Sequence, residues 1–200
     1  MDTLLAAERG DANAQFTLGL MYMDGEGMPQ DYAEAMWWFR LSAEQGNADA
    51  QYYLGVMHHL GNGVPQNSAE AVRWYQLAAE QDNHHAQFTL GLMCRNGEGV
   101  PQDDAEALRW CHLAAEQGNA DAQETLGDMY YTGKSMSQDY AEAARWLRLA
   151  AEQGLAKAQS NLGFMYRSGR GVPQDHAEAL RWFQLSAEQG EAAGQANLGM

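Results

Sequence analysis

The sequence predicts an all-α fold, an α/α superhelical solenoid of 36-residue helix-turn-helix repeats, and three features predict it. A Leu-Gly pair recurs every 36 residues without insertion, at 18–19, 54–55, 90–91, 126–127, 162–163 and 198–199. Trp recurs with the same period at 38, 74, 110, 146 and 182, as does Glu-Gln at 44–45, 80–81, 116–117, 152–153 and 188–189. A turn such as Gly61-Asn62-Gly63-Val64-Pro65-Gln66, or a near copy, separates two apolar-periodic segments in each repeat. Stacked helical pairs of this kind bury apolar faces that one pair alone leaves exposed.

The period divides the chain into full repeats with a partial unit at each end. The full repeats are 12–47, 48–83, 84–119, 120–155 and 156–191, flanked by an N-terminal half unit, 1–11, and a partial C-terminal unit, 192–200. The half unit is recognised because Leu-Ala-Ala-Glu-Arg-Gly at 5–10 matches Leu-Ala-Ala-Glu-Gln-Gly at 149–154. We therefore expect residues 1–200 to form a single solenoid.

The first helix of each repeat is expected over repeat positions 1 to 13, counting Ala12 as position 1. Asn47, Asn83 and Asn119 directly precede it and are good N-cap residues. A glycine follows it in every repeat, at 25, 61, 97, 133 and 169, and glycine adopts the left-handed C-terminal conformation at little cost. At about 100° per residue, positions such as Ala50, Leu54 and Met57 form one apolar stripe that faces the core.

The second helix begins with a capping box, an Asp or Asn three residues before a Glu. The pairs are Asp31/Glu34, Asn67/Glu70, Asp103/Glu106, Asp139/Glu142 and Asp175/Glu178. Glycines at 46, 118, 154 and 190 end this helix, and Asp82 is the exception. The fourth repeat lacks the second Gly and the Pro in its turn, 133–138, so we expect a more mobile loop there with the helical pair retained.

Charge and composition exclude several classes of function. Lys and Arg number 12 against 27 Asp and Glu, a net charge of −15, which argues against nucleic-acid binding because phosphates need a basic face. No uncharged apolar run approaches the ~18 residues of a membrane-spanning helix. No signal peptide follows Met1, so we expect a cytoplasmic chain, or a secreted or periplasmic one if a leader was removed. Cys94 and Cys111 are expected as buried thiols, with a disulfide between them as the alternative.

The repeated motif resembles the Sel1-like repeat family, a relative of the tetratricopeptide repeats. The matching residues are Leu-Gly-x-Met-Tyr-x-x-Gly-x-Gly-Val-Pro-Gln-Asp, followed by Ala-Glu-Ala and Trp, and they cover 12–191. The resemblance implies a scaffold or adaptor that binds a protein or peptide, with the first helices lining a concave surface. Some cysteine-rich members were proposed as β-lactamases, which gives a hydrolase as an alternative function.

Candidate partner-binding residues occupy positions 5, 9 and 12 of the first helix, which vary between repeats and lie opposite the core stripe. They are Phe16, Leu20, Met23, Tyr52, Val56, His59, Phe88, Leu92, Arg95, Tyr131, Phe164 and Arg167. The first three repeats are apolar there, whereas the last two are more polar, with Glu124, Asp128 and Ser160. Exposed apolar stripes mark interaction surfaces, so we expect a groove for an extended peptide or a helix, whose carboxylates would meet Arg95, Tyr131, Arg167 and Arg170. The alternative is that Phe16, Tyr52 and Phe88 pack sideways on neighbouring first helices.

Other conspicuous residues receive structural interpretations. Arg73, Arg109, Arg145 and Arg181 each follow a Glu by three residues, which favours solvated ion pairs over a basic patch. Trp37 replaces this arginine in the first repeat and is either a packing substitute or a contact point. The pairs His58-His59 and His84-His85 would lie roughly 15 Å apart on parallel helices, too far for a shared metal, and His58 is expected in the core.

No catalytic motif is present in the sequence. It contains no Gly-x-Ser-x-Gly, no His-Glu-x-x-His and no phosphate-binding loop, so we expect a non-enzymatic protein without a cofactor. Self-assembly through the solenoid ends is the second binding hypothesis, because residues 192–200 lack a partner helix and would expose Leu198.

Overall fold

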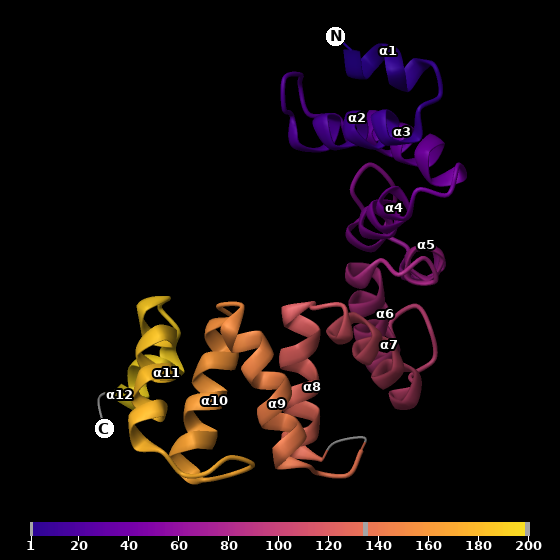
Figure 1. The fold of residues 1–200 in the computed structure, drawn as a ribbon. Coiled ribbons are helices and arrows are strands. Elements are labelled where there is room, and N and C mark those ends of the chain that lie inside the picture. The colour runs from indigo at the N-terminus through magenta and orange to yellow at the C-terminus, as the bar shows by residue number, and fades with distance from the viewer. Residues whose placement is uncertain (1, 134–135, 199–200) are drawn as a thin grey trace. The chain divides into compact units, whose positions relative to one another are not determined.

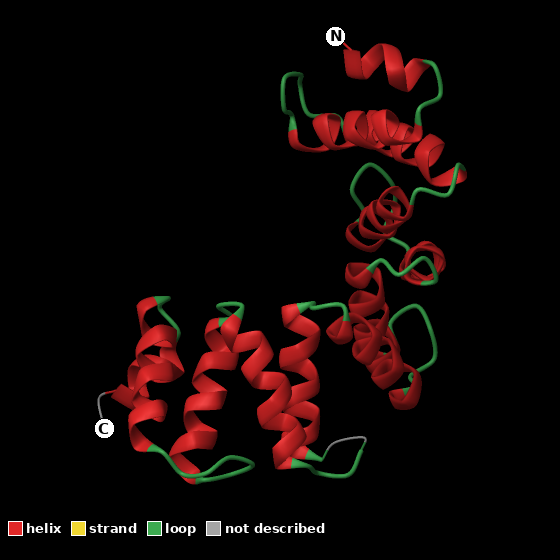
Figure 2. Ribbon diagram, in the orientation of Figure 1, coloured by secondary structure: helices red, strands yellow, loops and turns green. Residues whose placement is uncertain are grey.

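The computed structural model describes residues 2–133 and 136–198, and these residues form helices joined by turns, with none of them in a strand (Figures 1 and 2). The helices are α1 (Asp2–Glu8), α2 (Ala12–Asp24), α3 (Tyr32–Glu44), α4 (Ala48–Leu60), α5 (Ser68–Ala79), α6 (His84–Asn96), α7 (Asp104–Glu116), α8 (Ala120–Thr132), α9 (Tyr140–Glu152), α10 (Ala156–Ser168), α11 (His176–Glu188) and α12 (Ala192–Leu198). The predicted all-α solenoid of 36-residue repeats is confirmed. In these two segments no helix has both the length and the apolar character needed to cross a bilayer.

The chain forms two compact units, Met1–Ala107 and Leu108–Met200. The first unit contains α1 to α6 and the beginning of α7, and the second contains the rest of α7 and α8 to α12. Within each unit, helices that follow one another in the chain pack together, such as α2 on α3 and α8 on α9.

The first helix of each full repeat spans thirteen residues, as its capping residues predict. At its start the side chain of Asn47 accepts a hydrogen bond of 2.8 Å from the amide of Ala50. At its end Gly61 has a φ of 77°, and its N–H donates to the carbonyl of Met57. The fourth-repeat loop that was expected to be mobile includes residues 134–135, which lie outside the described residues, and its helical pair α8 and α9 is present.

The capping box at the second helix is only half formed. Asp31 accepts hydrogen bonds from the amides of Ala33 and Glu34, as predicted. Its own amide, however, donates to the carbonyl of Tyr22 in the preceding helix at 2.9 Å, and the same bond joins Asp175 to Tyr166. The backbone amide of the cap residue therefore links the two helices of a repeat. The side chain of the Glu three residues later is then able to interact with another partner.

That partner is the arginine three residues later. Carboxylate–guanidinium distances are 3.2 Å for Glu70–Arg73, 3.0 Å for Glu142–Arg145 and 3.1 Å for Glu178–Arg181. The guanidinium groups of Arg145 and Arg181 also lie 4.6 and 4.9 Å from the ring centroids of Trp146 and Trp182. In these three repeats the arginines form the solvated ion pairs that the spacing predicts.

Trp37 replaces the arginine in the first repeat and packs edge-on against Trp38, with ring centroids 4.3 Å apart. Its side chain stays 52% exposed. Trp37 thus packs against the neighbouring tryptophan ring, as the guanidinium groups do in other repeats, and half of its surface remains open to solvent.

Close approach of the paired helices requires glycine at repeat position 8. A Cβ on Gly55 would lie 2.6 Å from the ring of Tyr75, and a Cβ on Gly19 would lie 2.6 Å from Phe39. Because the side chain at position 28 packs directly on the glycine, its size decides how completely the space between the helices is filled. The fully buried Leu54 and Met57 complete the core of this repeat.

Candidate protein-binding surfaces

The first helices of the first unit carry a half-buried apolar strip, which we call the aromatic strip. Its members are Phe16, Leu20, Met23, Tyr52, Val56, Phe88 and Leu92, from α2, α4 and α6. The ring centroid of Phe16 lies 5.8 Å from that of Phe39 and 5.7 Å from that of Tyr53 in the next repeat. Both interpretations of these aromatic residues therefore describe part of the structure: the rings pack sideways, and part of each side chain faces solvent.

Tyr52 shows the same dual arrangement one repeat later. Its ring centroid lies 5.7 Å from that of Tyr75 in its own repeat and 5.7 Å from that of His85 in the next. Burial raises the pKa of the Tyr52 hydroxyl above its ordinary value, and the neighbouring Tyr53 adds to the increase. Tyr52 is consequently a neutral, half-buried group.

The histidines near this strip have no common site. The Nε2 atom of His59 lies 3.2 Å from a carboxylate oxygen of Glu98, while His84 and His85 pack against each other with ring centroids 4.0 Å apart. His58, expected in the core, is only half-buried, and burial lowers its pKa. Across the part of the chain that the structure describes, no group of three or more His, Cys, Asp or Glu residues is arranged to hold a metal ion. Arg95 is half-buried on α6.

The cysteines lie where the repeat positions place them. Cys94 is 3% exposed in the first unit, and Cys111 is 2% exposed in the second, each as a thiol. Both belong to positions that carry aromatic residues in other repeats, and each is a small apolar group in the core.

In the second unit, charged side chains join the first helices α8 and α10. The Nζ atom of Lys157 lies 2.5 Å from Oε1 of Glu124 and 3.3 Å from Oδ2 of Asp128. The side-chain amide of Asn161 donates to Oδ1 of Asp128 at 3.0 Å. Burial raises the pKa of Glu124 to about 7, and Asp128 adds to this increase while Lys157 opposes it. The four side chains thus share one proton-sensitive cluster, with Glu124 only 8% exposed.

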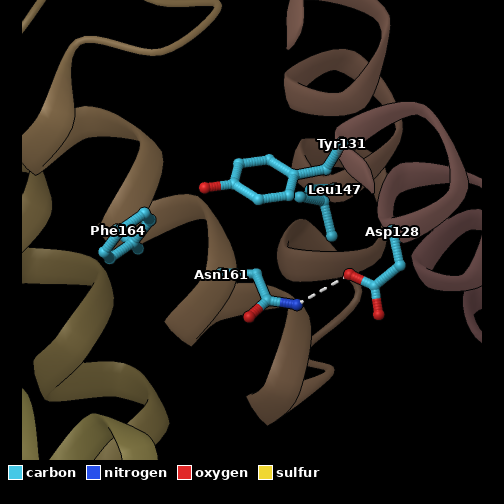
Figure 3. A pocket seen from close by; sticks show the side chains of 5 residues that line it. All are labelled: Asp128, Tyr131, Leu147, Asn161 and Phe164. Carbon is cyan, nitrogen blue, oxygen red and sulfur yellow. Dashed lines mark hydrogen bonds between the residues drawn. The ribbon is translucent and has the colours of Figure 1, made fainter. Parts of the chain in front are cut away.

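Beside this cluster lies a cavity of about 210 Å³, which we call the Leu147 pocket. Figure 3 shows its lining residues, which come from α8, α9 and α10: Asp128, Tyr131, Leu147, Asn161 and Phe164. Leu147 is buried at 1% exposure, whereas Phe164 is 37% exposed and the other three are half-buried, so the pocket has an apolar base and a mouth on the surface. The rings of Tyr131 and Phe164 have centroids 6.5 Å apart at an interplanar angle of 74°.

Two of the positions that line this pocket carry a stacked aromatic pair between the first and second repeats. Position 28 holds Phe39, Tyr75 and Phe183 in three repeats, Cys111 in the third repeat and Leu147 in the fourth. Position 6 holds Asn161 in the fifth repeat and Thr in the first, third and fourth. In the second repeat it holds Tyr53, which stacks on Phe39 with centroids 5.3 Å apart. Where two stacked rings fill the space between first helices in the first unit, a leucine and an amide leave it open in the second.

Two arginines flank the mouth of this pocket. The guanidinium carbon of Arg167 lies 5.2 Å from the ring centroid of Phe164, and that of Arg170 lies 5.8 Å from it. Arg170 donates a hydrogen bond to the hydroxyl of Tyr131, and Arg167 donates to Oδ1 of Asn197 at 2.6 Å. Three of the residues predicted from sequence, Tyr131, Phe164 and Arg167, are therefore brought together at one site.

Sequence analysis missed the remaining members of the site. Leu147 in the fourth repeat, and Lys157 and Asn161 in the fifth, are each a residue type that no other full repeat carries at that position. A comparison of positions 2, 6 and 28 would have revealed this signal. It also missed the glutamine at position 4 of every repeat, because a polar residue beside the apolar stripe was not assigned a partner.

Comparisons with known proteins agree with this architecture. The Sel1 repeat model matches residues 12–47, 48–83, 84–119, 120–155 and 156–191. Over 98% of its length the chain resembles a protective antigen of uropathogenic Escherichia coli that displays an SLR fold, with 43% identity and a TM-score of 0.94. It also resembles a Sel1 repeat protein from Oxalobacter formigenes over 98% of its length, with 38% identity and a TM-score of 0.93. The chain covers 42% and 57% of those two proteins, about half of their length.

An immunity protein from Pseudomonas aeruginosa shares the fold at 22% identity and a TM-score of 0.58, over 92% of this chain and 67% of that one. The sequence matches no curated protein. Since the repeat model accounts for residues 12–191 without a gap, the chain belongs to the Sel1 repeat family.

Proposed function

We propose that this chain is a scaffold that binds protein or peptide segments through the exposed sides of its first helices. Sel1 repeat proteins are generally protein-interaction scaffolds, and the solenoid is typically non-catalytic. The proposal goes further by naming the surfaces: the aromatic strip in the first unit and the Leu147 pocket in the second.

The Leu147 pocket is the observation that carries the proposal. Its volume of about 210 Å³ exceeds the roughly 150 Å³ of an apolar cavity that admits benzene, but is below the roughly 300 Å³ at which most small-molecule sites begin. A pocket of this size suits one large side chain of a partner. Anchoring of an aromatic or aliphatic side chain in such a pocket is the usual source of affinity at protein interfaces.

The aromatic strip supports the same function in the first unit. Phe16 and Tyr52 are held by ring contacts from two repeats, so little conformational entropy remains to be lost when a partner covers them. Aromatic residues fixed in this way are enriched at interfaces.

Selection from a random dodecapeptide library displayed on phage, with the purified full chain as bait, tests the proposal. We expect recovered peptides to bind with dissociation constants below about 100 µM, which corresponds to about 5.5 kcal/mol. Substitution of Phe16, Tyr52 and Phe88 by Ala, and separately Leu147→Phe, should each weaken a subset of these peptides at least about tenfold.

The matched control is Trp37→Arg, which restores on the second helix the arginine of the other repeats. This exposed residue lies outside both proposed surfaces, so W37R should bind every selected peptide as the native chain does. Failure to recover any binding peptide would contradict the proposed function, and equal binding by all variants would show that the first-helix surfaces are not used.

A further inference from the structure

We infer that the Leu147 pocket binds an aromatic side chain of an acidic peptide segment, whose carboxylates bind Arg167 and Arg170. This inference rests on the proposed function and specifies the chemistry of the partner at one of its surfaces. It follows from the shape of the pocket and from the charges around its mouth.

The walls of the pocket favour an aromatic side chain. Leu147 forms the base, and Tyr131 and Phe164 form two walls from different helices, as Figure 3 shows. In the first unit the corresponding space is filled by the stacked rings of Phe39 and Tyr53. A partner ring would supply the aromatic group that this repeat lacks, with edge-to-face contacts to the existing rings.

The charges at the mouth favour carboxylates. Arg73, Arg145 and Arg181 on the second helices each pair with a glutamate. Among the residues that the structure describes, by contrast, no carboxylate lies within ion-pair distance of Arg167 or Arg170, and their hydrogen-bond partners are the neutral Asn197 and Tyr131.

The acidic groups of the site do not neutralise these arginines. Glu124 and Asp128 both pair with Lys157, and Asp128 also accepts a hydrogen bond from Asn161. The carboxylates of the cluster are therefore engaged by Lys157 and Asn161 on one side of the pocket. The guanidinium groups on the other side stay available to bind carboxylates, which they recognise with two parallel hydrogen bonds.

Three fluorescein-labelled peptides with identical Gly-Ser flanks test the inference against the full chain by fluorescence polarisation. Their central residues are Glu-Phe-Glu, Glu-Ala-Glu and Gln-Phe-Gln. We expect Glu-Phe-Glu to bind most tightly, with at least about a tenfold loss for each altered peptide and weaker binding at about 0.5 M than at about 0.15 M salt.

Variants of the chain assign each loss to its group. Leu147→Phe fills the pocket. It should lower the affinity for Glu-Phe-Glu to the affinity that the native chain has for Glu-Ala-Glu, and it should leave the affinity for Glu-Ala-Glu unchanged. The double substitution Arg167→Gln and Arg170→Gln should abolish the preference for Glu-Phe-Glu over Gln-Phe-Gln. Arg181→Gln is the matched control, because its guanidinium pairs with Glu178, and it should change nothing.

Leu147→Phe is expected to fold, because Phe183 occupies the same position against Gly163 in the fifth repeat. Asn161→Tyr, which fills the pocket from α10 as Tyr53 does in the second repeat, provides a second variant. Equal binding of the three peptides, tighter binding of a Lys-Phe-Lys peptide, or Glu-Phe-Glu affinity that survives both filling variants would overturn the inference. Absence of binding by all three peptides would also overturn it, whereas the dodecapeptide selection decides the proposed function independently.

Discussion

The side chain of Gln81 donates a hydrogen bond of 2.7 Å from Nε2 to Oε1 of Gln51. Gln51 is 5% exposed, and its own Nε2 donates to the carbonyl of Ala43 in the preceding repeat at 3.2 Å. The same arrangement recurs with Gln15 and Gln45, with Gln123 and Gln153, and with Gln159 and Gln189. A buried amide thus joins one repeat to the next at each of these places.

Gln51→Leu should destabilise the first unit by about 0.5–1.5 kcal/mol, because it removes the hydrogen bond from Gln51 to the carbonyl of Ala43 and leaves that carbonyl with the bond from the amide of Gly46. Native-state hydrogen exchange measures the effect repeat by repeat, which suits an array whose unfolding need not be two-state. Gln81→Leu, at an exposed position, is the control and should cost less. Equal protection in Q51L and the native chain would contradict a structural role for this amide.

Asp82→Gly should stabilise the chain by about 0.5–1 kcal/mol. Asp82 has a φ of 62° and is the one non-glycine residue with positive φ among those described, at a position where Gly46 and Gly118 have values of 89° and 91°. Glycine adopts this left-handed conformation without the steric cost that a Cβ imposes. Thermal denaturation should show a higher Tm for D82G and a lower one for the reverse control, Gly118→Asp; a lower Tm for D82G would be the contrary result.

Stability should depend on pH through Glu124. Its pKa is raised by burial from 4.5 to about 7 in the folded chain, so the folded state binds the proton more tightly than the unfolded state. By linkage, the stabilising contribution is fully present below pH 4.5 and is lost as the pH rises through about 7. The free energy of unfolding of the native chain minus that of Glu124→Gln should therefore decrease across this window, as measured by urea denaturation.

The exposed Glu188, replaced by Gln, is the control for this titration. A difference between the native chain and E124Q that is constant with pH would show that Glu124 ionises as an ordinary surface carboxylate does, and one that grows as the pH rises would show that folding lowers its pKa.

Gly55→Ala should destabilise the chain by about 1–3 kcal/mol through overpacking. The new Cβ would lie 2.6 Å from the ring of Tyr75, which is buried in the same repeat. Because alanine favours helix more than glycine by roughly 0.5–1 kcal/mol, any loss of stability in urea denaturation comes from this contact. A more stable G55A chain would show that the two helices separate without cost.

The sequence determines the helices so directly that their ends could be predicted. Asn47 and Gly61 bracket α4 as their capping preferences require, and Glu70 and Arg73 pair at the predicted spacing. The Leu147 pocket could not be predicted in this way, because it is lined by side chains from three helices rather than formed by any motif. Whether Phe16 faces solvent or a neighbour was equally undetermined, since its ring contacts Tyr53 and remains half-buried.

The hydrogen bonds from buried glutamines to the preceding repeat have a consequence for how such a chain grows. Each of these glutamines donates to a main-chain carbonyl, which every amino acid possesses. The hydrogen bond therefore does not depend on which side chain the preceding repeat carries at the acceptor residue. A duplicated segment inserted between two existing ones would meet the same acceptor on one side and offer the same donor on the other. Lengthening by gene duplication therefore requires no matching mutation for this hydrogen bond, and each new copy can acquire its own outward-facing residues.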